Sequence, residues 1–207
     1  MTMKLASALS GLVCTVLAGA AAAKEDALKV QLGRMADRTY QCGLDQTLYI
    51  GPGAKSLTWL GSGELKNFKL PETNLDISAA NARLTRAGTV RFELPAGASE
   101  KALTLRLLSA PERRKPDMAG MTAELFVNDD KVGDNCTATP GRAAFVEARF
   151  NTIRANLCGN DPAPACIAEL RKRCGTELAP ACLAEAKPVL AKISKAHFDR
   201  MNARAKR

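Results

Sequence analysis

The sequence predicts an α+β protein, in which an antiparallel β-sandwich or small barrel is followed by a disulfide-stapled three-helix domain. Short apolar or alternating runs, separated by Gly and Pro turn signals, fill residues 48–127 and are typical of antiparallel sheets. A repeat with an offset of 16 residues, carrying four Cys, lies between helical patterns in the last third of the chain. The chain of 207 residues is long enough for two such units. We assign 24–140 to the β-rich domain and 141–207 to the helical domain.

Residues 1–23 have the layout of a secretory signal peptide. Lys4 supplies a positive start, an apolar stretch follows, and a run of four Ala ends at Ala23, just before the charged Lys24. A membrane anchor is the alternative, but the apolar stretch is short for a span and no charged stop follows it closely. We therefore expect cleavage after Ala23 and export to the periplasm or the extracellular space. The Ala-rich leader favours a bacterial source.

Six of the seven Cys remain after this cleavage. An even number in an exported chain predicts three disulfides in an oxidising compartment. A zinc site is the alternative, but zinc thiolates usually come in pairs separated by two to four residues. Every gap between Cys here holds at least seven residues, so we expect neither a metal site nor another cofactor.

The repeat predicts how four of these Cys pair. Each copy has Cys-Gly, then Ala-Pro-Ala-Cys, then Ala-Glu, starting at Cys158 and at Cys174. The Gly suits the left-handed residue that ends a helix, and the Pro suits the first turn of the next helix. Each copy is therefore a helix end, a turn and a helix start, which predicts Cys158–Cys166 and Cys174–Cys182. Cys166 and Cys174 lie at opposite ends of one helix, roughly 12 Å apart, which is too far for a bond. Cys42 and Cys136 are left to pair with each other.

Periodicity places the individual elements. A short helix is predicted over 28–36, and three more over 142–157, over 165–173 and beyond residue 182, the last kinked or split by Pro188. The predicted strands are 48–50, 57–59, 65–70, 75–77, 89–94, 103–108, 123–127 and, after a hairpin turn at 128–131, 133–136. Residues 111–120 are predicted to form an exposed basic loop.

Two segments carry a resemblance to a known family. Tyr40-Gln-Cys42, and the stretch from Ala123 to Cys136, are similar to the ends of the periplasmic c-type lysozyme inhibitor family. The resemblance covers residues 40–136 only and implies a small antiparallel β-barrel with a disulfide of this kind. Family members insert a Ser-Gly-containing loop and a nearby Lys into the lysozyme cleft. The corresponding segments here, Ser78 to Arg83 and Phe92 to Gly97, lack the Ser-Gly pair, its following Tyr and the Lys-Gly, so no inhibitory residue is transferred.

Catalytic residues are not evident in the sequence. The single His, His197, lies on the apolar stripe of the last helix, the carboxylates are scattered, and no nucleophile motif occurs. We therefore expect a protein that is not an enzyme. A hydrolase would need a pair of carboxylates that only folding brings together.

Positive charge is concentrated in the helical domain. Residues 24–140 hold 16 Lys and Arg against 15 Asp and Glu, whereas residues 141–207 hold 13 against 6. The candidate residues for binding an anionic surface or partner are Lys187, Lys192, Lys195, Arg200 and Arg204. A merely solvated face is the alternative. Nucleic acid is not expected, because the compartment is wrong and no ladder of aromatic residues is present.

These patterns predict a secreted, non-catalytic binding or envelope-associated protein. Its basic helical domain is expected to contact an anionic envelope component or a protein, with peripheral membrane contact. The alternative is a lysozyme-type hydrolase inhibitor that acts through the β-rich domain. The basic helical domain would repel a basic lysozyme, which is an argument against that alternative.

Overall fold

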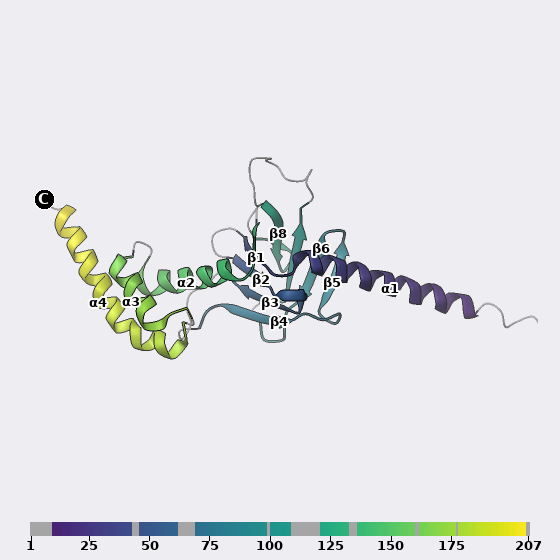
Figure 1. Cartoon of the computed structure of the whole chain (residues 1–207), viewed down its shortest axis with the longest axis horizontal. Helices are drawn as coiled ribbons and strands as arrows, with labels where there is room; N and C mark the ends of the chain where they lie inside the picture. The colour runs from purple at the N-terminus through teal and green to yellow at the C-terminus, as the bar shows by residue number, and fades with distance from the viewer. Residues whose placement is uncertain are drawn as a thin grey trace, which may run out of the picture.

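The computed structural model describes residues 10–42, 46–61, 69–98, 100–108, 121–132, 136–159, 162–176 and 178–205. It confirms the predicted α+β class: an antiparallel half-barrel is followed by three helices (Figure 1). The β-rich part is one curved sheet rather than a sandwich, with strand order β4-β3-β2-β1-β10-β8-β7-β6-β5 and β9 paired to β8.

The strands are short and, in every pair described, antiparallel. They are β1 (Arg38–Cys42), β2 (Gln46–Ile50), β3 (Ser56–Leu60), β4 (Glu72–Asp76), β5 (Ala82–Arg86), β6 (Thr89–Glu93), β7 (Ala102–Leu107), β8 (Met121–Val127), β9 (Asp130–Lys131) and β10 (Cys136–Pro140). A single 3₁₀ turn, η1 (Pro52–Ala54), joins β2 to β3.

Most predicted strands are present, with shifted boundaries. The strand predicted to end at residue 136 instead begins there, since β10 spans Cys136–Pro140. Residues 133–135 lie outside the described part. Residues 65–68 of another predicted strand, and the basic loop at 111–120, also lie outside it. Strand β5 was not predicted, because Ala82–Arg86 is an edge strand in which three of five side chains are exposed and Leu84 is the one large apolar residue.

The first and last strands of the half-barrel lie side by side in its sheet. Cys42 pairs with Cys136 across β1 and β10, and the two Cys form the predicted disulfide with their Cα atoms 4.1 Å apart. The bond links positions 94 residues apart in the chain. It therefore covalently fixes the strand pair that joins the two halves of the sheet.

Helix α1 (Ser10–Met35) packs on the half-barrel through its C-terminal part. It contacts η1, which joins β2 to β3, and also β5 and β6, which lie at the other end of the sheet order. Leu28 and Met35 are buried in the core of the half-barrel, and Leu32 packs against that core. The helix predicted over 28–36 is thus the end of a longer one. Ala22 to Ala27 are exposed, so the packed part of α1 begins after the predicted cleavage site, which stays a prediction.

The three C-terminal helices are α2 (Ala143–Cys158), α3 (Pro164–Cys174) and α4 (Pro180–Ala205). The disulfides Cys158–Cys166 and Cys174–Cys182, with Cα separations of 6.0 and 5.7 Å, connect consecutive helices as predicted. Gly159 and Gly175 follow α2 and α3 with φ of 86° and 54°, which other residues rarely adopt. Both copies of the repeat therefore form the predicted helix end, turn and helix start.

Pro188 does not split the last helix. Residues 180–205 form one helix that contains Pro188, so of the two predicted outcomes, a kink or a split, the split does not occur. Proline removes one backbone hydrogen bond, and packing on both sides of it, through Ala186 and Leu190, holds the helix together. The axis of α4 changes direction between its first turns and its C-terminal half (Figure 1), which agrees with a kink.

Helix α2 packs against the outside of the half-barrel at β1 and β2. The Phe145 and Tyr49 rings lie 6.2 Å apart and form a small buried cluster with Leu60. Arg149 Nε lies 2.9 Å from Glu72 Oε2, with both side chains largely buried. Apolar contacts and an ion pair therefore connect the helical region directly to the sheet.

Candidate binding surface at the end of the last helix

The first half of α4 is packed and its end is not. Leu183, Ala186 and Leu190 are buried in the core shared with α2 and α3, and Ile193 packs at its margin. From Lys195 to Arg204 every side chain is exposed except the half-buried His197. Figure 1 shows this end of α4 extending beyond the other two helices. The geometry therefore leaves about ten residues of helix without cover from the bundle.

Two large apolar side chains lie on this uncovered end. Phe198 is 65% exposed and Met201 is 48% exposed, and we call them the apolar pair. Met201 follows Leu190 by eleven residues, or about three helical turns, so it continues the face that is buried in the bundle. Phe198 is its neighbour three residues earlier. The buried face of α4 thus becomes an exposed apolar face beyond the bundle.

Two of the five predicted residues lie next to the apolar pair. Arg200 and Arg204 are exposed and are within one turn of Met201. Neither has an ion-pair partner among the residues that the structure describes. Their guanidinium groups can therefore lie on the same side of the helix as the apolar pair, because long basic side chains extend past apolar neighbours.

The other three predicted residues are exposed on α4 but are placed differently. Lys195 Nζ lies 2.8 Å from Asp199 Oδ2, so its charge is already matched. Lys192 precedes Met201 by two and a half turns, which places it about 13 Å away along the axis and on the opposite side of the helix. Lys187 is farther still, on the packed part of the helix. The predicted set of five is therefore not one surface.

The exposure of the apolar pair was not predicted. The periodic pattern predicts an apolar stripe along the last helix, but periodicity indicates which side chains share a face and not what covers that face. Helix lengths could have revealed the difference. Helix α4 has 26 residues, whereas α2 has 16 and α3 has 11, and the uncovered residues 195–204 of the longer helix span roughly 15 Å at 1.5 Å per residue.

We also searched the described residues for a membrane-spanning helix and for a metal site. No described helix is long and apolar enough to cross a membrane. No three His, Cys, Asp or Glu side chains in the described ranges gather as a metal site. The three disulfides indicate that the protein folds in an oxidising compartment.

Comparisons with protein-family models, with curated proteins and with solved structures find no match to this chain. The resemblance to the lysozyme inhibitor family therefore stays a prediction. The two segments that correspond to the family's inhibitory region lie at one edge of the sheet: Ser78 to Arg83 form the turn into β5 and its start, where the Ser78 N–H donates to Asn81 Oδ1 at 2.9 Å. Phe92 to Gly97 form the end of β6 and the turn after it.

Proposed function

We propose that this protein is a non-catalytic, envelope-associated module that binds an anionic lipid surface through the end of α4. The observation that carries the proposal is the exposed apolar pair, Phe198 and Met201, beside two cations, Arg200 and Arg204, that have no ion-pair partner in the part of the chain that the structure describes. A helix with apolar side chains on one face and basic side chains beside them lies in the plane of a lipid interface. The apolar groups enter the acyl boundary while the guanidinium groups contact phosphates.

The apolar pair favours lipid over a soluble or wall polyanion. A polyanion attracts the charges of α4 but gives no reason to leave Phe198 and Met201 in water. Partial burial of two such side chains in the interface stabilises the bound state by about 1–2 kcal/mol each. Each nearby Lys or Arg adds about 1 kcal/mol at an anionic surface. Both contributions are needed for stable attachment of a single helix end.

The rest of the molecule is arranged so that it does not oppose this contact. The half-barrel region, 24–140, has a formal charge of +1, so it is not repelled by an anionic surface, and the helical region carries +7. The Cys174–Cys182 disulfide holds the start of α4 against α3. The end of α4 is therefore presented by a rigid base. Localisation to a bacterial periplasm is part of the same proposal.

Vesicle binding tests the proposal. The full chain is mixed with zwitterionic vesicles or with vesicles containing anionic phospholipid, at about 0.1 M and about 1 M NaCl, where the Debye length falls from about 10 Å to about 3 Å. We expect strong binding to anionic vesicles at the lower salt and clear loss at the higher salt. Equal binding to both vesicle types, or none to either, would refute it.

The lysozyme-inhibitor alternative has one supporting observation. The Cys42–Cys136 disulfide joins the first and last strands of an antiparallel half-barrel, as the resemblance implies. A turbidity assay with lysozyme and bacterial cell walls tests it directly. Slower clearing in the presence of the full chain would support inhibition, and an unchanged rate would remove the alternative.

A further inference from the structure

Two arginines near the end of α4, Arg200 and Arg204, are spaced so that they can act together. They lie four residues apart on one helix, which places their Cβ atoms about 5–6 Å from each other on one flank of it. Both side chains are exposed, and Met201 lies beside them. The two guanidinium groups can therefore reach one point in the solvent. We call these two residues the arginine pair.

The arginine pair has no carboxylate near it. No Asp or Glu lies three or four residues before or after Arg200 or Arg204 in the sequence. Neither arginine is in an ion pair in the described part of the chain. Asp199 lies about 100° around the helix from Arg200 and about 140° from Arg204, and Lys195 Nζ already matches its charge at 2.8 Å.

Like charges at this spacing repel each other and destabilise a helix. The preceding turn of α4 shows the opposite arrangement, since Lys195 and Asp199 are also four residues apart and carry opposite charges. A ligand with two negative charges would remove the repulsion between Arg200 and Arg204, because it pairs with both. The arrangement therefore favours a dianion over a monoanion.

Guanidinium groups match phosphate in shape as well as in charge. Each presents a planar fork of N–H donors that bonds to two phosphate oxygens, whereas an ammonium group acts as a point charge. A phosphodiester has two free oxygens and one negative charge, so one arginine satisfies it. A phosphomonoester has three free oxygens and a charge between about −1.5 and −2 at pH 7, so it can accept hydrogen bonds from two arginines.

The flank of the helix next to the arginine pair is apolar. The order around the helix, over about 160°, is Arg200, Arg204, Met201 and Phe198. A phosphate held by the two arginines would therefore leave an attached acyl chain beside Met201 and Phe198. A free phosphate would use the arginines and leave both apolar side chains in water.

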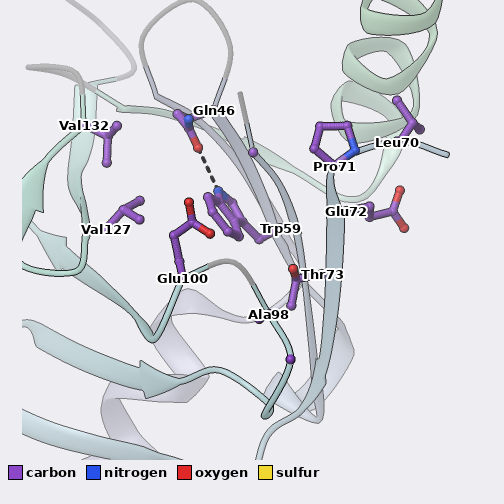
Figure 2. Close-up of a pocket in the computed structure, with 12 residues that line it drawn as sticks. Gln46, Trp59, Leu70, Pro71, Glu72, Thr73, Ala98, Glu100, Val127 and Val132 are labelled. Atoms are coloured by element: carbon purple, nitrogen blue, oxygen red, sulfur yellow. Dashed lines mark hydrogen bonds between the residues drawn. The ribbon is translucent and has the colours of Figure 1, made fainter. Parts of the chain in front are cut away.

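A cavity of about 370 Å³ in the half-barrel is not an alternative site for phosphate. Trp59 is one of the residues that line it, and its Nε1–H already donates to Gln46 Oε1 at 2.9 Å (Figure 2). The described residues that line the cavity include Glu72 and Glu100 but no Lys, Arg or His. A phosphate there would meet carboxylates without a cation from this lining.

We propose that the arginine pair binds the phosphomonoester head group of a lipid. Arg200 and Arg204 donate to the same phosphate, and Met201 and Phe198 lie against the chains of that lipid. This proposal rests on the proposed function, because it names the lipid class that the same surface recognises. It adds a preference that net charge does not give: at equal surface charge, a phosphomonoester lipid binds more tightly than a phosphodiester lipid.

Vesicles of matched surface charge test this preference. The full chain is mixed with zwitterionic vesicles that carry either phosphatidic acid, a phosphomonoester, or phosphatidylglycerol, a phosphodiester, in amounts adjusted to the same zeta potential. Sedimentation measures the bound protein. We expect binding to phosphatidic acid to be tighter by about fivefold or more. Equal binding to both overturns this proposal and leaves the proposed function standing, whereas binding to neither refutes both.

A charge-conserving variant tests whether the guanidinium forks are responsible. Arg200→Lys with Arg204→Lys keeps both charges and removes both forks. We expect it to bind phosphatidylglycerol vesicles within about twofold of the unmodified chain and to lose the preference for phosphatidic acid. Arg34→Lys with Arg38→Lys changes two exposed arginines elsewhere and should keep the preference. A preference that survives in the first double variant, or is lost in the second, overturns the proposal.

A soluble competitor distinguishes a lipid from a free phosphate. Glycerol 3-phosphate carries the phosphomonoester without acyl chains. It is added to the chain bound on phosphatidic acid vesicles, at the same concentration as that lipid and at constant ionic strength. We expect most of the chain to stay bound, because the competitor gives Met201 and Phe198 no contact. Release of most of the chain would identify a free phosphate as the ligand and contradict the lipid source.

Discussion

Arg149 on α2 lies 2.9 Å from Glu72 at the start of β4, and both side chains are about four-fifths buried. This ion pair connects the two parts of the chain that the sequence suggests are separate. Tyr49 and Phe145 pack nearby, so a charged contact and an apolar contact cover one junction. The helical region is therefore anchored to the sheet at α2, and α4 extends from the other side of the bundle (Figure 1).

A double-mutant cycle measures what this pair contributes. Glu72→Gln or Arg149→Met leaves one largely buried charge without its partner, and we expect each to lower the free energy of unfolding by about 2 kcal/mol, between the values for exposed and buried pairs. The double variant should lose less than the sum, with a coupling energy of about 1 kcal/mol. Urea unfolding gives these values. Additive losses would show that the two side chains do not interact.

Removing disulfides should separate long-range from local constraints. Cys42→Ser with Cys136→Ser removes a bond between residues 94 positions apart in the sequence. In the chain-entropy model this lowers the free energy of unfolding by about 4–5 kcal/mol. Cys158→Ser with Cys166→Ser removes a bond between residues only 8 positions apart, and we expect it to lower the free energy of unfolding by about 2–3 kcal/mol. Chemical denaturation of the two double variants compares them. A larger loss for the helical pair would contradict this ranking.

Glu124 makes folding stability depend on acid pH. Burial alone would raise the pKa of Glu124, but hydrogen bonds from Lys131 Nζ at 2.8 Å and from the Arg106 guanidinium at 2.9 Å outweigh it, so its pKa is lowered. A lowered pKa in the folded state stabilises the protein above the unfolded pKa of about 4.3, and that stabilisation is lost as the pH falls through the folded pKa.

We therefore expect Glu124→Gln to be less stable than the unmodified chain at pH 7 and nearly equal to it well below pH 4. Thermal unfolding across this pH range measures the difference. Asp130→Asn on the adjacent β9 is the control, because Asp130 has no ion-pair partner within the described ranges. A difference in stability between Glu124→Gln and the unmodified chain that grows as the pH falls would contradict a lowered pKa of Glu124.

Features encoded in neighbouring residues could be predicted from the sequence. The Cys-Gly and Ala-Pro-Ala-Cys signals fix both helical turns, and they predicted two disulfides from chain geometry alone. The pairing of Cys42 with Cys136 followed by elimination, but the antiparallel order that places β1 beside β10 did not. Sheet order depends on contacts between distant residues, which a single sequence does not display.

Features that depend on what covers a surface could not be predicted. Periodicity indicates which residues share a face of α4 and not what covers that face. Cys166, near the start of α3, lies beside Leu190 and Ser194, and Met201 lies beyond this point on α4. Trp59 and Glu100 are 41 positions apart in the sequence, and only the curvature of the sheet makes them line the same cavity. The helix over 28–36 was predicted from its periodicity, while its packing on the core of the half-barrel and the full length of α1 were not.

The central claim, that the end of α4 binds an anionic lipid surface, is tested most directly by comparing two charge-matched variants. Arg200→Gln with Arg204→Gln removes the cations beside the apolar pair, and Lys187→Gln with Lys192→Gln removes two cations elsewhere on the same helix. At about 1 kcal/mol per charge, we expect the first variant to lose about thirtyfold in partitioning onto anionic vesicles. The second should lose less than threefold. Equal losses would mean that net charge alone attracts the protein, and would contradict a specific surface at Phe198 and Met201.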